Sequence, residues 1–203
     1  DKVGNLDEAL YAVVDVQLSS DHSAGLPPGP YMFAIRRWTF KGVKEEEWLQ
    51  SSVCSIRTGE ILQDELGETV VNLARLHGVD WLEAQSVVDP KSAADCLDRL
   101  ELHLADAYGR AAKRKQDENS DRLMFQLHGI DQHLATRLQV LEATRDRHEL
   151  LGRIGLVRAT QGRIDKLRAR MELKREQVSQ RSRVVADQQL VCAGLLKVGD
   201  CNG

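Results

Sequence analysis

Apolar residues recur at alternating spacings of three and four through the second half of the chain, a pattern typical of helices that pack along one face. One run comprises Leu123, Leu127, Ile130, Leu134 and Leu141, and a second comprises Ile164, Leu167, Met171 and Val178. Gly152 and Gly155 lie between the runs and are the best candidates to reverse the chain. The pattern predicts a coiled-coil-like antiparallel hairpin with arms of about 25 residues, or roughly 38 Å each.

Helical spacing also appears earlier in the chain. A helix is predicted from Asp64, with Gly78 as its stop, and a second from Pro90, a residue suited to a first helical turn. The pattern leaves open whether this second helix breaks near Asn119-Ser120 or continues to about Arg147. Ser and Asn cap helices but also occur inside them, so these residues do not decide the question.

Strand-like runs occupy the two ends of the chain. Residues 10–19, 31–40 and 50–57 are rich in β-branched and apolar residues and are separated by turn signals, which favours a small antiparallel meander. The apolar run 184–198 is expected to rejoin this sheet, because a strand without a neighbour exposes unpaired backbone groups. The helical hairpin is then an insertion before the last strand.

The predicted fold class is therefore α+β, a small antiparallel sheet with a covering helix and an inserted helical hairpin. The expected domains are a sheet-containing base, residues 1–90 plus 184–203, and a helical arm, residues 91–183, that turns near 148–156. Charge follows the same division: residues 110–183 carry 18 Lys+Arg and 10 Asp+Glu, whereas the remainder carries 10 and 21, within a net charge of −3. A basic arm on an acidic body indicates a binding or lever module.

The second run of the hairpin carries the candidate contact residues, since basic side chains flank its apolar seam. They are Arg158, Arg163, Lys166, Arg168, Arg170, Lys174 and Arg175. Lys174 falls on the seam itself, where an amine weakens packing. Three interpretations stay open: a solvated helix face, contact with a nucleic-acid backbone, and contact with a protein partner. No aromatic residue lies within 153–183, which argues against stacking on single-stranded bases.

Signatures of catalysis and of metal binding are missing from the sequence. It holds no phosphate-binding loop, no dinucleotide fingerprint and no pair of histidines at metalloprotease spacing. The four cysteines, Cys54, Cys96, Cys192 and Cys201, are far apart and are expected to be unpaired thiols. The run 45–47 of three glutamates is expected to be a solvated loop. No metal or cofactor is therefore predicted for this chain, and an enzyme that uses the acidic body is the least favoured class.

Two segments carry a family resemblance. Residues 155–170 contain an Arg-x-x-x-Gly-Arg-Ile-x-x-Leu-x-x-Arg helix start, and residues 191–198 form a small-apolar strand around Ala-Gly. Together with residues 12–18 and the turn 57–60, these segments resemble the C-terminal region of large bacterial Swi/Snf-type helicase-like ATPases. None of the matching residues is catalytic.

The resemblance implies a non-catalytic accessory domain that contacts duplex DNA, the ATPase motor or another protein of a complex. ATP and Mg²⁺ are then expected only in the motor of the parent protein. The alternative is a stand-alone protein-interaction or dimerisation coiled coil. In either case we expect a cytoplasmic location without a membrane partner, because no run approaches the roughly 18–20 apolar residues that span a bilayer.

Overall fold

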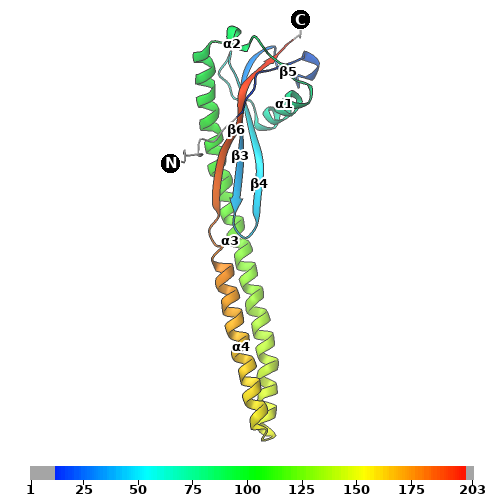
Figure 1. Ribbon diagram of the computed structural model, residues 1–203, viewed down its shortest axis with the longest axis vertical. Helices are drawn as coiled ribbons and strands as arrows, with labels where there is room; N and C mark the ends of the chain where they lie inside the picture. Colours follow the sequence, from blue (N-terminus) through cyan, green and yellow to red (C-terminus); the bar gives the residue numbers. More distant parts are fainter. Residues whose placement is uncertain (1–11, 200–203) are drawn as a thin grey trace, which may run out of the picture. The chain divides into compact units, whose positions relative to one another are not determined.

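The computed structural model describes residues 12–199 and shows an α+β protein (Figure 1). Its elements in chain order are β1 (Ala12–Val13), β2 (Val16–Leu18), the 3-10 turn η1 (Ser20–His22), β3 (Gly29–Lys41), β4 (Glu45–Ser55), α1 (Asp64–His77), β5 (Val79–Asp80), α2 (Ala84–Val87), α3 (Pro90–Leu150), α4 (Ile154–Ser179) and β6 (Val185–Val198). They form two compact units. The sheet unit comprises residues 12–39, 46–111 and 186–199, and the hairpin unit comprises residues 40–45 and 112–185.

The structure has one mixed sheet of six strands in place of the expected antiparallel meander. Five strands follow the order β4-β3-β6-β2-β5, and the sixth, β1, pairs with β6. The last strand, β6, does rejoin the sheet, but it lies between β3 and β2 and pairs in parallel with β2 and with β1. The meander was correct for β3 and β4, which are neighbours, but wrong for the first strand, because β6 takes the place beside β2 that local pairing would have given to β3. A strand that follows a long insertion is not confined to an edge position.

The first predicted strand, 10–19, is divided in the structure, where β1 and β2 are separated by Val14 and Asp15; residues 10 and 11 lie outside the described residues. Val14 donates its backbone N–H to the carbonyl of Ala193 (3.1 Å), and the Asp15 carboxylate accepts the backbone N–H of Leu195 (3.1 Å). At Gly194, between these two contacts, a Cβ atom would overlap the carbonyl oxygen of Val14. The absence of a side chain at Gly194 therefore permits this close pairing.

Both faces of the sheet are covered within the sheet unit. Tyr31 and Phe33 of β3 join a buried cluster with Leu18, Leu196 and Val70, and Val70 belongs to the covering helix α1. On the opposite face of β3, Trp38 packs edge-on against Tyr108 of α3, with ring centroids 5.7 Å apart. Alternate β3 residues thus meet different helices, which explains why residues 31–34 are all buried.

Helix α3 is continuous from Pro90 to Leu150, so the break considered near Asn119-Ser120 does not occur. Its residues 91–111, predicted as part of the arm, belong to the sheet unit, where Cys96, Leu100 and Leu104 are buried. Helix α1 begins at Asp64 and ends before Gly78, as predicted. The three glutamates 45–47 open strand β4 and do not form the expected loop.

The hairpin unit contains residues 112–150 of α3 antiparallel to α4, and the predicted seam lies between them (Figure 1). Ile130, Ile164 and Met171 are buried, and the other predicted seam residues are half-buried. Gly152, with φ +67°, forms the turn, whereas Gly155 lies inside α4. The left-handed backbone at the turn favours glycine because it lacks a Cβ atom.

Asn119 is a buried polar residue in the middle of α3, within the hairpin unit. Its Nδ2 donates to the carbonyls of Arg181 (2.9 Å) and Ser182 (3.0 Å), and its Oδ1 accepts the backbone N–H of Val43 (2.7 Å). Gln116, one turn earlier, donates to the Ser182 carbonyl and accepts the Val184 N–H. These amides hold the segment after α4 and the β3–β4 turn against α3.

The described cysteines, Cys54, Cys96 and Cys192, are free thiols, and Cys201 lies outside the described residues. Burial, reinforced by the neighbouring Cys96 thiol, raises the pKa of Cys54 to about 12. The Cys54 thiol therefore stays protonated near neutral pH, which makes it a poor nucleophile. Across residues 12–199, none of the helices has the length and apolar character needed to cross a bilayer.

Candidate functional site

A basic groove of about 610 Å³ lies between α3 and α4 in the hairpin unit. Its walls carry five cationic side chains and one imidazole, over an apolar floor. The cations are Arg137 from α3 and Arg163, Lys166, Arg170 and Lys174 from α4; the imidazole is His133, and the floor is Val140, Leu141, Leu167 and Met171. We call this hollow the basic groove.

Helical geometry places the four α4 cations in a row. Arg163, Lys166, Arg170 and Lys174 are three, four and four residues apart, so they share one face of the helix. At 1.5 Å per residue the row is about 16 Å long. Arg137 extends the positive charge to the facing helix. The arrangement suits an extended anion better than a single small one.

The charge of the basic groove is not neutralised locally. No carboxylate lines it, and within residues 12–199 none of its five cations forms an ion pair. All five cations are solvent-exposed, so an anion can reach them directly from solvent. Their attraction to such an anion is screened by salt.

The groove exists because the seam is not filled along its whole length. Lys174, predicted on the seam, and His133 line both the basic groove and a second hollow of about 400 Å³ that continues toward Gln126 and Val178. A long polar side chain does not bury itself between two helices as leucine does. The two hollows together form one channel along the hairpin.

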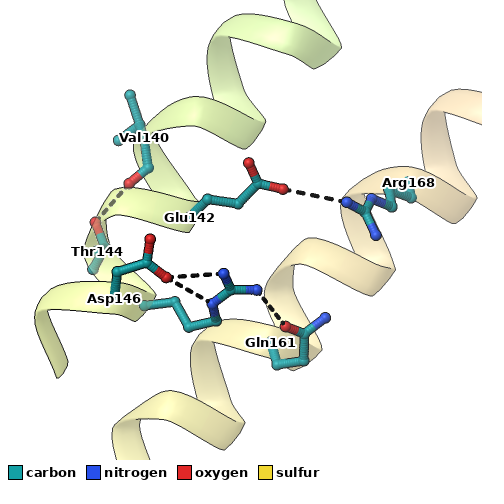
Figure 2. A network of polar contacts seen from close by, with 7 residues as sticks. Val140, Glu142, Thr144, Asp146, Gln161 and Arg168 are labelled. Atoms are coloured by element: carbon teal, nitrogen blue, oxygen red, sulfur yellow. Dashed lines mark hydrogen bonds and ion pairs between the residues drawn. The ribbon is translucent and has the colours of Figure 1, made fainter. Parts of the chain in front are cut away.

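Two of the predicted contact residues are engaged inside the hairpin. Figure 2 shows Arg168 of α4 facing Glu142 of α3, with 3.3 Å between nitrogen and oxygen. Arg175 pairs with Asp131 at 3.2 Å. These cross-helix ion pairs are solvent-exposed, and each contributes only about 0.2–1 kcal/mol. They nevertheless neutralise both arginines, which leaves them less available to an external anion.

Figure 2 also shows polar contacts nearer the turn of the hairpin. Asp146 accepts hydrogen bonds from Arg145, and the same guanidinium donates to Gln161 of α4 at 3.3 Å. The hydroxyl of Thr144 donates to the carbonyl of Val140 one turn earlier. Of these contacts only the Arg145–Gln161 hydrogen bond joins α3 to α4; the other two lie within α3.

The seven predicted contact residues thus separate into three groups. Arg163, Lys166, Arg170 and Lys174 come together in the basic groove, Arg168 and Arg175 form ion pairs, and Arg158 is exposed outside the groove. Sequence reasoning missed Arg137 and His133 on α3. A signal was present for Arg137, because it follows Ile130 by seven residues and so falls where a seven-residue repeat expects another seam residue.

Comparison with known proteins does not assign the chain to a family. No protein-family model matches the chain, and no curated protein sequence matches it. Within residues 12–199, no three or more His, Cys, Asp or Glu side chains gather in a group that could hold a metal ion. The basic groove is therefore the candidate functional site.

Proposed function

We propose that this chain is a binding module whose basic groove contacts the sugar-phosphate backbone of duplex nucleic acid. The observation that carries the proposal is a row of cations about 16 Å long without any lining carboxylate. Arg and Lys are the side chains that suit phosphate, and several on one face act additively by displacing counterions. The groove thus supplies affinity for a backbone without selecting a base sequence.

The composition of the groove favours a duplex over an unpaired strand. Proteins that hold single strands without sequence preference stack successive bases on aromatic side chains. The groove is lined by aliphatic residues, by the basic residues and by His133, and it has no Trp, Tyr or Phe. Contact is therefore expected with phosphates and not with exposed base faces.

The proposal extends to a non-catalytic accessory domain of a Swi/Snf-type DNA-dependent ATPase. It is supported by the resemblance of residues 155–170 and 191–198 to the C-terminal region of such ATPases. Residues 155–170 also contain Arg163, Lys166 and Arg170 of the basic groove. In this role the chain binds DNA for a motor that supplies ATP hydrolysis, and the motor domains are its partners.

The double variant Arg163→Gln/Arg170→Gln tests the proposal. Loss of two phosphate contacts should weaken binding of a 20-bp duplex by about 50-fold at 0.1 M salt. Fluorescence anisotropy of a labelled duplex measures this. The matched control is Arg168→Gln/Arg175→Gln, which removes the same two charges from the same helix at positions that already pair with carboxylates.

The control should retain affinity within about threefold, since it removes no free cation from the groove. If both variants weaken duplex binding equally, the loss of affinity depends only on net charge, and a specific role for the groove is contradicted. Circular dichroism of both variants shows whether the helices are intact.

A second candidate is a protein-interaction or dimerisation coiled coil, and the hairpin turn supplies the observation that favours it. Leu150, Leu151, Ile154 and Leu156 are exposed around the turn, and Leu150 is 89% exposed. Adjacent exposed apolar side chains are typical of protein contact surfaces. Light scattering separates the candidates: self-association at micromolar concentration supports dimerisation, and a monomer that binds duplex supports the basic groove.

A further inference from the structure

A second cationic hollow, of about 260 Å³, lies in the sheet unit and shares no lining residue with the basic groove. Four segments converge on it: the loop before β3, the turn after β4, the β5–α2 region and the end of β6. Its lining residues are Pro28, Gly29, Pro30, Arg57, Trp81, Val87, Lys197, Val198 and Gly199. We call it the tryptophan pocket.

The walls of the tryptophan pocket place two cationic side chains beside apolar residues. Arg57 and Lys197 line it, no carboxylate does, and neither cation forms an ion pair within residues 12–199. The Lys197 ammonium lies over the Trp81 ring, 5.8 Å from its centroid. Trp81 is buried, and its indole N–H has no acceptor in the described part of the chain.

Two glycines with an unusual backbone conformation lie at the edge of the pocket. Gly29 and Gly199 both line it and both have φ +155°, a conformation that residues with a side chain rarely adopt. A Cβ atom at Gly29 would lie 3.8 Å from the guanidinium of Arg57, and one at Gly199 would lie 3.9 Å from Pro28. Both distances are ordinary van der Waals contacts, so the two positions favour glycine because of their backbone conformation and not because space is lacking.

We propose that the tryptophan pocket binds a phosphate monoester that carries a flat ring. Two unpaired cations match the double negative charge of such a phosphate, which accepts strong charge-assisted hydrogen bonds. Val87, which is exposed, and the rings of Pro28 and Pro30 provide the apolar contact for the ligand ring, whereas Trp81 lies buried beneath the Lys197 ammonium. A free nucleotide and the 5′-phosphorylated end of a nucleic-acid strand share this chemistry.

Isothermal titration of the full chain with adenosine 5′-monophosphate tests the proposal. Binding should be saturable, and adenosine, which lacks the phosphate, should bind at least tenfold more weakly because both charged contacts are lost. The variant Arg57→Gln/Lys197→Gln should lose at least tenfold in affinity for the nucleotide. A 5′-phosphorylated trinucleotide that binds more tightly than the mononucleotide identifies a strand end as the ligand, and the reverse order identifies a free nucleotide.

Matched controls come from each unit. Arg75→Gln/Lys91→Gln removes one exposed arginine and one exposed lysine of the sheet unit that do not line the pocket, and it should leave nucleotide affinity unchanged. Arg163→Gln/Arg170→Gln should also leave it unchanged, so failure of the basic groove and failure of this pocket are separate results. Absence of nucleotide binding at millimolar concentration, or equal loss in the Arg75/Lys91 control, would overturn the proposal.

Discussion

Replacing Gly194 by alanine should destabilise the sheet unit by about 4 kcal/mol or more, an effect at the extreme of single substitutions. The new Cβ atom would overlap the carbonyl oxygen of Val14 and lie 2.7 Å from its carbonyl carbon. Both of these atoms are backbone, so no side-chain rotation relieves the overlap. The chain must instead separate at the pairing of β1 with β6, where Val14 donates to Ala193.

Urea unfolding followed by circular dichroism measures the destabilisation. Gly109→Ala is the matched control, because Gly109 lies in α3 of the same unit and a Cβ atom there meets nothing within 4 Å. That control should be stabilised by about 0.5–1 kcal/mol, as expected for glycine to alanine inside a helix. A Gly194→Ala protein as stable as the parent would contradict the close pairing of Val14 with β6.

Asn119→Ala should destabilise the hairpin unit by about 3 kcal/mol, because a buried group that loses its hydrogen-bond partner retains its full desolvation penalty. The substitution removes the acceptor of the Val43 N–H and the donor to the carbonyls of Arg181 and Ser182. Asn119 is only 3% exposed, so water does not replace its amide without rearrangement. The cost should appear as a lower urea midpoint.

Gln139→Ala is the control, since Gln139 is an exposed residue of the same helix. Its effect should stay within about 0.5 kcal/mol. Gly42→Ala probes the same contact from the other side, because a Cβ atom at Gly42 would overlap Oδ1 of Asn119. If Asn119→Ala unfolds at the same urea concentration as the parent, the amide does not anchor the β3–β4 turn.

Local signals were enough to predict most of the helices. The spacing of Leu123, Ile130, Ile164 and Met171 located the hairpin, since each helix must bury its apolar stripe against the other. Gly152 was predicted as a turn residue because glycine readily adopts the left-handed backbone that a tight turn requires. This preference depends on the residue alone, and the structure shows that backbone at Gly152. The α+β class followed from strand-like composition at both ends of the chain.

The pairing of segments that are far apart in the sequence was not predictable from local signals. The sequence of residues 185–198 does not indicate that they pair in parallel with β2. Parallel pairing depends on where the chain re-enters the sheet after the inserted helices. The sequence also did not indicate that α3 continues without a break. Asn119 acts there as a buried anchor for Val43 and Ser182, two residues that are far from it in sequence.

The candidate site was predicted in part for a related reason. The sequence predicted seven basic residues beside the seam of α4 as one contact set, and the structure places four of them, Arg163, Lys166, Arg170 and Lys174, in one groove. The contribution of Arg137, and the engagement of Arg168 by Glu142, depend on how α3 is rotated against α4. Rotation is set by seam packing across both helices, which the pattern of one helix does not define.

The salt dependence of duplex binding tests the central claim most directly. If the five cations of the basic groove each neutralise one phosphate, the logarithm of the association constant should fall with the logarithm of salt concentration with a slope of about −4.5. Anisotropy titrations of the unmodified chain between about 50 and 200 mM salt give this slope. A slope near zero, or no duplex binding at the lowest salt, would contradict the account.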